Sequence, residues 1–99
     1  MRPIILARID KMRPAALLTR DLAVPLLRYV TVAPIISTVR GIATEVAVGP
    51  ENGLDHGSVI NCDNIHTIER SDLGRHIGFL LPEQEAALTE AILAAFDLQ

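Results

Sequence analysis

A short polar segment near the middle of the chain holds residue types suited to bind an anion. Ser37, Thr38 and Arg40 lie between two segments rich in β-branched residues. Hydroxyl groups can orient a phosphate oxygen by hydrogen bonds, and a guanidinium can pair with it in a fixed, planar geometry. These three side chains therefore direct the functional interpretation toward phosphate chemistry.

Two strands are expected to hold this polar segment in place. Val30 to Ile35 and Thr44 to Val48 consist largely of β-branched residues, which are enriched in strands. Gly41 lies between them and can adopt the positive φ that a tight reversal requires. The pattern predicts a β-hairpin with the polar segment at its tip.

Further short strands are expected on both sides of this hairpin. Their ranges are Ile4 to Ile9, Pro14 to Thr19, Ser58 to Cys62, His66 to Ile68 and Arg75 to Leu80. The segment Arg20 to Arg28 contains Asp21 and Pro25 and is expected to be a loop, with one helical turn at LAVPLL, residues 22–27, as the alternative. Because no helix long enough to connect parallel neighbours lies between the strands, we expect an antiparallel sheet that curves into a small barrel.

The last element is expected to be an α-helix from Pro82 to Phe96. Pro82 suits the first helical position, and acidic residues in the first turn complement the helix dipole. Apolar residues recur at helical spacing at Leu88, Ile92, Ala95 and Phe96. The fold class is therefore mainly β (α+β), with a C-terminal amphipathic helix that would cover one opening or edge of the barrel.

The length of 99 residues predicts a single domain covering residues 1–99. Although 49% of the residues are apolar, no apolar run approaches the ~20 residues of a membrane span, and Arg8 and Asp10 interrupt the N-terminal segment before a signal-peptide core could form. We therefore expect a cytoplasmic protein without contact to a membrane. The apolar content also predicts a homodimer whose interface includes the C-terminal helix or the central hairpin.

Cysteine usage excludes two classes of site. Cys62 is the only cysteine, so the chain cannot form an internal disulfide or a zinc finger. No cluster of carboxylates or histidines has the spacing of metal ligands, so we expect neither a metal ion nor a cofactor.

The net charge of −3 hides an asymmetry between the two halves of the chain. Residues 1–48 hold seven basic and three acidic residues, whereas residues 49–99 hold two basic and nine acidic ones. The N-terminal half could therefore present a basic face to a polyanion. The alternative is that these charges are spread over a solvated surface.

The order and spacing of several short motifs resemble those of the MazF/PemK toxin family. The motifs are Arg13-Pro14 before an apolar strand, VAPI, TVRGIATEV, the turn Asn52-Gly53-Leu54-Asp55, SVINCDNIHTI, and LGRHIGFL before a final helix. The resemblance implies an SH3-like barrel that forms a homodimer and acts as the toxin of a type II toxin-antitoxin system. Such a toxin is a metal-independent endoribonuclease, or mRNA interferase, that cleaves single-stranded RNA at short sequences, inhibits translation and growth, and is neutralised by a MazE-like antitoxin.

The chain departs from the family pattern in two places. The usual first strand and long loop before the Arg-Pro pair are shortened to RIDKM, residues 8–12. The family usually places Thr after API, and this chain has Ile36. If a hydroxyl is required beside the scissile phosphate, then either Ser37 or Thr38 has taken over its role or the chain is a slow enzyme.

Arg13, Ser37 and Thr38 are the predicted catalytic residues. Cleavage by the neighbouring 2′-hydroxyl needs a base or acceptor at that hydroxyl, positive charge at the phosphorane oxygens, and a proton donor at the leaving 5′-oxygen. Arg13 suits the second need and, in a desolvated dimer groove, could also serve the third. Because a guanidinium stays charged and is a poor acid, stabilisation is the favoured role. Ser37 and Thr38 would orient the phosphate. The alternatives are a surface arginine at a strand start and hydroxyls bonded to their own turn.

Six further residues are predicted to bind RNA: Arg8, Lys11, Arg40, Asp63, Asn64 and His66. Asn64 and His66 share a face if their strand continues, and amide and imidazole groups suit the edges of unpaired bases. The alternative is an Asx turn made by Asp63 and Asn64.

The remaining ring side chains are expected to be structural. His66 is predicted to be the only histidine that titrates near the site, with His56 in a turn and His76 on an apolar strand. Phe79 and Phe96 are expected in the core, which would leave little aromatic surface on which bases could stack.

Two other functions remain open at this point. CcdB-like relatives, which the resemblance brings in, use the same barrel to poison DNA gyrase by protein contact. The other hypothesis is a catalytically weakened homologue that binds RNA or an antitoxin, and Ile36 supports it.

Overall fold

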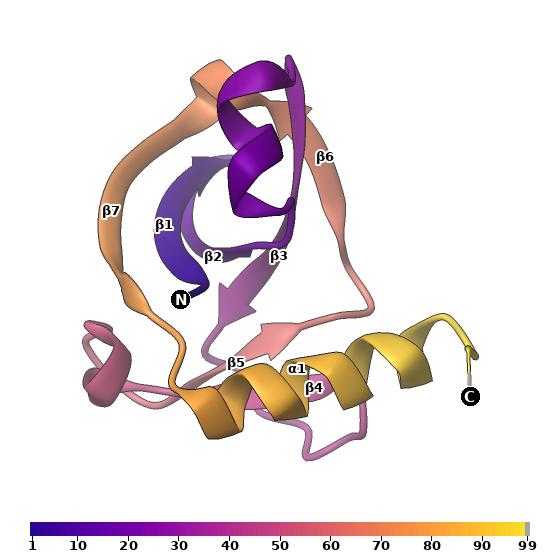
Figure 1. Cartoon of the computed structure of the whole chain (residues 1–99). Coiled ribbons are helices and arrows are strands. Elements are labelled where there is room, and N and C mark those ends of the chain that lie inside the picture. Colours follow the sequence, from indigo (N-terminus) through magenta and orange to yellow (C-terminus); the bar gives the residue numbers. More distant parts are fainter. Residues whose placement is uncertain (99) are drawn as a thin grey trace.

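One strongly curved antiparallel sheet makes up most of the protein, which we describe from a computed structural model covering residues 1–98 (Figure 1). Its strands are β1 (Pro3–Arg8), β2 (Met12–Leu17), β3 (Tyr29–Ile36), β4 (Glu45–Val48), β5 (Ser58–Asn61), β6 (His66–Glu69) and β7 (Leu73–Phe79). Neighbours follow the order β4, β5, β3, β2, β1 and β7, and β6 also pairs with β3. All of these pairings are antiparallel. The expected fold class is confirmed.

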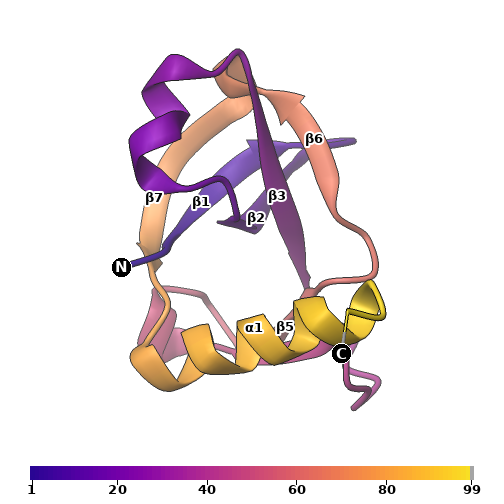
Figure 2. The same ribbon diagram turned by 45° about the vertical axis from the view of Figure 1, so that its right-hand side comes forward.

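The helical segments are three short 3₁₀ helices and one α-helix. They are η1 (Asp21–Leu26), η2 (Pro50–Asn52), η3 (Arg70–Asp72) and α1 (Pro82–Ala95). The predicted C-terminal helix is confirmed, and between Arg20 and Arg28 the helical turn that was the alternative to a loop is present as η1. In two views, η1 and α1 lie at opposite ends of the molecule (Figures 1 and 2). Among residues 1–98, no helix is both long and apolar enough to cross a membrane.

β3 is the central strand because it pairs with three other strands. β2 lies along one edge. β6 and β5 share the other: His66 of β6 is opposite Val32, and Ile60 of β5 is opposite Ile35. The predicted hairpin is wrong, because β5 lies between β3 and β4. A β-branched pattern identifies a strand but not its neighbour, and the turn signals after β4 do not show that the chain returns to insert β5.

The edge that β5 and β6 share contains a gap. Two residues of β3, 33 and 34, span the distance that five residues, 61–65, span on the other side. The three additional residues cannot follow the ladder, and the chain forms a turn at 62–64, in which Cys62 stays buried. Pro34 has no N–H to donate and lies in this part of β3. The sheet is therefore split beside the end of β3.

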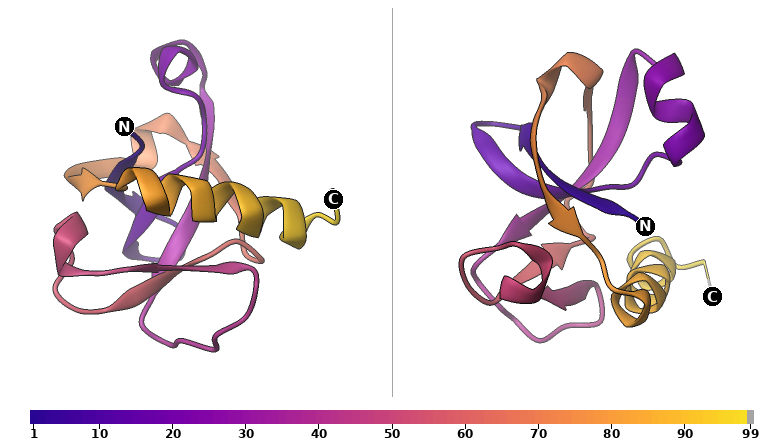
Figure 3. Two further views of the ribbon diagram at one scale, coloured as in Figure 1. Left: turned by 60° about the horizontal axis from the view of Figure 1, so that its bottom comes forward. Right: turned by 60° about the vertical axis from the view of Figure 1, so that its left-hand side comes forward.

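Apolar side chains pack on both faces of the sheet. Val30 and Val32 point to one face and Ala33 and Ile35 to the other, as strand alternation requires. The first face also buries Ala7, Ala15 and Leu17. The second buries Ile4, Ile60, Leu80, Leu88 and Ala91, the last two from α1. Figure 3 shows α1 lying across this side of the molecule.

Phe79 and Phe96 do not belong to the core, contrary to expectation. Their side chains are 46% and 55% exposed. Phe79 ends β7 and packs against His76 with ring centroids 4.7 Å apart, and Phe96 caps the C-terminus of α1. More aromatic surface is exposed than the sequence predicts, but neither ring lines the cavities described below.

A buried asparagine anchors the loop between β4 and β5. Asn52 Nδ2 donates to the backbone oxygen of Phe79 at 2.9 Å and to Gln84 Oε1 at 2.6 Å, while its Oδ1 accepts from the Gly49 N–H at 3.0 Å. A Cβ at Gly78 would collide with the Asn52 carbonyl, so the loop approaches β7 only because residue 78 lacks a side chain. These contacts fix the base of loop 49–57.

Arg2 ties the start of β1 to α1 and to the end of β2. Its Nη2 donates to Glu85 Oε1 at 2.7 Å, and its Nη1 donates to the backbone oxygens of Leu17 and Leu18 at 2.9 and 3.1 Å. Hydrogen bonding to this guanidinium holds the pKa of Glu85 below its usual value.

Replacing Arg2 by alanine should lower the free energy of unfolding by about 1–2 kcal/mol, because two carbonyl groups lose a charged donor and a partly exposed ion pair is lost. Urea denaturation measures the change. The exposed Arg20, which makes no side-chain cap to η1, gives the control Arg20→Ala, with an expected change within about 0.5 kcal/mol. A lowered carboxyl pKa stabilises the fold above the ordinary glutamate range, so the Arg2→Ala effect should shrink as the pH falls below about 4. An equal loss of unfolding free energy in Arg2→Ala and Arg20→Ala would show that the contacts of Arg2 do not stabilise the fold.

Candidate active site

Two surface cavities meet at Arg13. The larger, of about 480 Å³, is lined by Arg13, Pro14, Ile35, Ile36, Ser37, Thr38, Arg40, Leu54, Asp55, His56 and Ser58. The smaller, of about 350 Å³, is lined by Ile9, Asp10, Arg13, Pro34, Ile36, Arg40, Asn61, Asn64 and His66. Arg13, Ile36 and Arg40 belong to both linings. The two cavities therefore form one groove, here called the Arg13 groove, with an arm on each side of Arg13.

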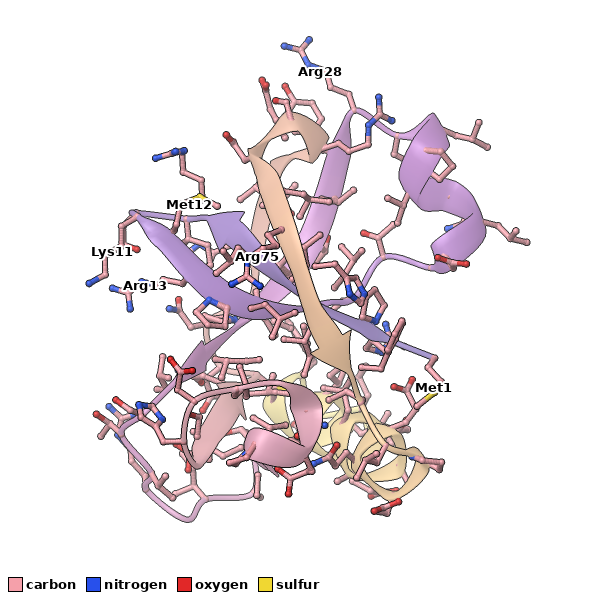
Figure 4. The ribbon with its side chains drawn as sticks, turned by 90° about the vertical axis from the view of Figure 1, so that its left-hand side faces the viewer. Met1, Lys11, Met12, Arg13, Arg28 and Arg75 are labelled. Carbon is pink, nitrogen blue, oxygen red and sulfur yellow. The ribbon has the colours of Figure 1, made fainter. Side chains whose placement is uncertain are left out.

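The hairpin of β1 and β2 presents Arg13 to this groove. Arg13 is the second residue of β2 and pairs with Ala7 of β1. The chain reverses at residues 9–11, where the Ile9 N–H donates to the backbone oxygen of Lys11 at 3.1 Å. Figure 4 shows Lys11, Met12 and Arg13 together at the tip of this hairpin, well separated from Arg28. The shortened loop thus places a cation at the end of a rigid ladder.

Asp10 holds the guanidinium of Arg13 in two hydrogen bonds. Arg13 Nε donates to Asp10 Oδ1 at 2.7 Å, and Nη2 donates to Oδ2 at 2.9 Å. Asp10 Oδ1 also accepts from the Lys11 N–H at 2.9 Å. These contacts, led by the bond from Arg13, lower the pKa of Asp10 far below its usual value, and the pKa of Arg13 is raised in turn. Sequence reasoning missed this partner, although its spacing of three residues across a turn is a usable signal.

The pair with Asp10 orients Arg13 without using up its donors. A guanidinium has five N–H groups, and Asp10 takes two of them. Both N–H groups of Nη1 and one of Nη2 are left for an anion in the groove. The side chain is 33% exposed, so a ligand can reach it.

Glu45 shapes the loop that joins β3 to β4. Its Oε1 accepts from the backbone N–H groups of Arg40 and Gly41, at 3.0 and 2.9 Å. Gly41 has a φ of +69°, so the predicted left-handed glycine is confirmed although the hairpin is not. The carboxylate thereby fixes the backbone that carries Arg40 into both arms of the groove.

The polar segment after β3 reaches the groove beside Arg13. β3 ends at Ile36, so strand alternation does not extend to Ser37 and Thr38, and both of these exposed residues line the larger cavity. Ile36 is half-buried and lines both cavities. An apolar side chain therefore stands next to Arg13 where the family pattern has a hydroxyl.

The β4–β5 loop adds residues to the site that sequence reasoning missed. Asp55, His56 and Ser58 line the larger cavity together with Arg13. The expectation that His66 is the only histidine near the site is therefore wrong. His56 Nδ1 lies 3.2 Å from Ser58 Oγ, and that hydroxyl donates to the His56 backbone oxygen at 3.2 Å. The turn signals showed that residues 55–57 form a loop, but not that the loop folds toward β2.

The smaller cavity contains two of the predicted RNA-binding residues. Asn64 and His66 line it together with Asn61, at the gap in the sheet between β5 and β6. Asn61 forms an Asx turn, because its Oδ1 accepts from the Asp63 N–H at 3.0 Å, and the alternative of an Asx turn made by Asp63 and Asn64 names the wrong residues. Asp63 Oδ2 accepts from the Thr44 hydroxyl at 2.6 Å and does not line either cavity. Asp63 thus joins two loops.

Arg8 and Lys11 are both exposed but lie outside the linings of the two cavities. Arg8 ends β1 and Lys11 lies in the turn that follows. They add positive charge beside the groove. Within residues 1–98, no group of three or more His, Cys, Asp or Glu side chains is arranged to hold a metal ion.

A family model described as "PemK-like, MazF-like toxin of type II toxin-antitoxin system" matches residues 3–96. The chain belongs to this family. The resemblance found in the sequence is confirmed by a relative named Endoribonuclease MazF3 of Mycobacterium tuberculosis, which is 59% identical over 98 residues, with 99% of this chain and 95% of the relative covered.

Solved structures support the same family assignment. A Mycobacterium tuberculosis toxin, MazF-mt6, matches with a TM-score of 0.96 and 58% identity, covering 99% of both chains. An endoribonuclease in complex with its cognate antitoxin, from a mycobacterial species, matches with a TM-score of 0.84 and 26% identity over 99% of this chain and 93% of that one. The toxin family member described here therefore has the fold of these proteins.

Replacing Glu45 by alanine should free the loop that carries Arg40, because two backbone N–H groups lose a charged acceptor worth roughly 1.5–3 kcal/mol. Hydrogen exchange at the amides of Arg40 and Gly41 should become about tenfold faster or more. Glu51→Ala, at an exposed position in η2, is the control and should leave both rates unchanged. Unchanged exchange in the Glu45 variant would show that other contacts hold the loop.

Proposed function

We propose that this toxin is a metal-independent endoribonuclease that cleaves single-stranded RNA in the Arg13 groove. Endoribonuclease activity follows from the family and from the 59% identity to a relative of that name. The observation that carries the mechanism is the meeting of Arg13, Ser37 and Thr38 in one cavity next to a second arm with polar side chains.

Arg13 would stabilise the transition state. When the 2′-hydroxyl attacks the neighbouring phosphorus, negative charge grows on the phosphorane oxygens. The free N–H groups of Nη1 and Nη2 can donate to those oxygens, while Asp10 keeps the guanidinium plane oriented. Preorganisation of this kind removes the cost of arranging the cation during the reaction.

Ser37 and Thr38 would orient the scissile phosphate. Both are exposed and line the larger cavity with Arg13. Ile36 cannot donate a hydrogen bond, and its side chain instead gives the groove an apolar wall. That wall excludes water from one side of the guanidinium and so strengthens its interaction with phosphate.

The two arms of the groove would hold the nucleotides on either side of the cleaved bond. Asn61 and Asn64 offer amide groups to base edges, which are accessible only in unpaired RNA, and His66 lines the same arm. Arg40 lines both arms and would contact the backbone. Arg8 and Lys11 would attract the RNA from outside the groove.

A homodimer and an antitoxin are proposed as partners, and the cytoplasm as the location, since the RNA substrate is there. The mycobacterial relative that was solved with its cognate antitoxin supports the second partner. For the dimer, the most exposed apolar residues of an ordered element are Leu22 and Leu26 on η1, at 85% and 81%. This surface fits a subunit contact better than the predicted C-terminal helix, whose Leu88 and Ala91 are already buried against the sheet.

The gyrase-binding alternative has no support in the groove. A protein that acts by contact alone needs no oriented arginine beside two hydroxyls, and the relatives named above are endoribonucleases. The weakened-homologue hypothesis depends on Ile36 and is tested by the second experiment below.

The first experiment is cleavage of a mixed-sequence RNA by purified protein in EDTA. We expect cleavage to persist and to leave a 2′,3′-cyclic phosphate and a 5′-hydroxyl, because the mechanism uses the 2′-oxygen as nucleophile and no divalent ion. Arg13→Ala should reduce the rate by about a hundredfold or more, since one preorganised charge at the transition state is worth ~3 kcal/mol, and Arg13→Lys should restore it only in part.

Arg28→Ala is the matched control, because this exposed arginine lies far from the Arg13 end of the molecule (Figure 4). Its rate should stay within about twofold of wild type. Loss of cleavage on chelation with recovery in Mg²⁺ would overturn the metal-free mechanism. Cleavage by Arg13→Ala within threefold of wild type would make Arg13 a structural residue.

The second experiment asks which hydroxyl serves the reaction. We expect Ile36→Thr to raise the rate less than threefold, because Ser37 and Thr38 already lie in the cavity with Arg13. Either Ser37→Ala or Thr38→Ala should then cost at least about tenfold, the equivalent of one hydrogen bond to a charged group. Rates on one fluorogenic RNA measure all three variants. A gain of tenfold or more from Ile36→Thr with neutral alanine changes would instead show that the hydroxyl is missing.

A further inference from the structure

Each arm of the Arg13 groove contains one histidine. His56 lines the larger cavity and His66 the smaller, and Arg13 belongs to both. The two come from different parts of the sheet: His56 from the loop before β5 and His66 from the first position of β6. A phosphate bound to Arg13 would therefore have an imidazole on each side.

This arrangement matches what cleavage by a 2′-hydroxyl requires. The attacking 2′-oxygen and the leaving 5′-oxygen occupy opposite sides of phosphorus in an in-line displacement. One side needs a group that takes a proton and the other a group that gives one. Arg13 suits neither need, because a guanidinium is a poor acid and has no acceptor. The groove therefore needs two further groups, on opposite sides of Arg13.

A contact with Ser58 positions the ring of His56. The buried Ser58 Oγ lies 3.2 Å from His56 Nδ1, and the same hydroxyl donates to the His56 backbone oxygen at 3.2 Å. With Nδ1 directed at the serine, Nε2 is the ring nitrogen that can meet a ligand. The tautomer with its proton on Nδ1 can accept a proton at Nε2, as a general base must.

We propose that His56 and His66 are the general base and general acid of RNA cleavage, one on each side of Arg13; this rests on the endoribonuclease function proposed above. His56 Nε2 takes the proton of the 2′-hydroxyl as the 2′-oxygen forms its bond to phosphorus. The bond from phosphorus to the 5′-oxygen breaks, and that oxygen takes a proton from the His66 imidazolium. The products are a cyclic phosphate and a 5′-hydroxyl, and both rings exchange protons with water to restore the starting state.

Arginines and carboxylates surround both imidazole rings. Arg13, Arg40 and Asp55 line the cavity of His56, and Arg13, Arg40 and Asp10 line that of His66. Guanidinium and carboxylate groups ordinarily titrate outside the neutral range. The pKa of Asp10 is lowered further by its bonds to Arg13.

The first test is the pH dependence of kcat/KM on a short RNA substrate. Wild type should give a bell-shaped profile with both limbs between about pH 5 and 8, since His56 must be neutral and His66 protonated. His56→Gln should lose the acidic limb and His66→Gln the basic limb, each with about a hundredfold or greater fall in kcat. His76→Gln is the matched control, because His76 lies on β7 outside both cavities and packs against Phe79. His76→Gln should keep both limbs of the pH profile and the wild-type rate.

The second test separates the acid from the base and both from a structural role. A substrate with sulfur in place of the leaving 5′-oxygen needs no proton donor, because a thiolate leaves readily. His66→Gln should cleave this substrate within about tenfold of wild type, while His56→Gln should remain as slow as before. Recovery of His66→Gln on the sulfur substrate also shows that the variant is folded. Losses that are equal on both substrates would assign His66 to structure or binding and overturn its role as acid.

The outcomes also separate this inference from the proposed function. If wild type cleaves RNA to a cyclic phosphate but its profile is flat, or if both variants behave like His76→Gln, the endoribonuclease function stands and the histidine pair is wrong. If the wild-type protein cleaves no RNA at any pH, the proposed endoribonuclease function and the roles of the two histidines are both wrong. Binding of an RNA with a 2′-deoxy residue at the cleaved position should be within threefold of wild type in both variants. A large loss of binding that accounts for the fall in rate would make the histidines RNA-binding residues only.

Discussion

The structure depends on one strand that must satisfy two partners along the same edge. β3 pairs with β6 through Val32 and with β5 from Ile35 onward, and the intervening chain has three residues too many for a continuous ladder. The edge of β3 between Val32 and Ile35 is therefore left without a paired strand. The opening next to Pro34 becomes the smaller arm of the Arg13 groove, which Asn64 and His66 line. This arm of the groove thus exists because the segment 61–65 is longer than the part of β3, residues 33 and 34, that lies opposite it.

The second requirement is that separate segments meet at the end of β3. The β1–β2 hairpin contributes Arg13, the loop after β3 contributes Ser37 and Arg40, and the β4–β5 loop contributes His56. Each segment is held by contacts outside the groove. The hairpin is held by the pairing of β2 with β1, and the loop after β3 by the Glu45 carboxylate on two backbone N–H groups. The β4–β5 loop is held by the buried Asn52. None of these anchors lines the groove. The residues proposed to contact RNA can therefore be polar and exposed without loosening the loops that carry them.

Local patterns in the sequence were sufficient to predict the elements and part of the site. Strand composition and helical spacing located the strands and α1, and a positive φ at Gly41 followed from its position between two strands. Such local patterns do not predict which strands pair with each other. The insertion of β5 between β3 and β4 depends on contacts between segments that are distant in the sequence. His56 was missed for the same reason, because the direction of its loop is set by contacts of Asn52 with Gly78 and Phe79, which lie far along the chain. Which of the residues in the groove act on RNA stays a prediction.

The contact between Asp10 and Arg13 has a consequence for turnover. An arginine without a resident carboxylate would bind any phosphate of a polyanion, and each such contact releases counterions and adds affinity that does not depend on sequence. Asp10 competes for the same guanidinium, so the pair presents no net charge to RNA that lacks the contacts of both arms. In the proposed reaction, the carboxylate is also next to Arg13 when the phosphorane charge disappears. If Arg13 acts as proposed, Asp10 would thereby favour release of the cleaved strand and shorten the time that non-cognate RNA stays bound.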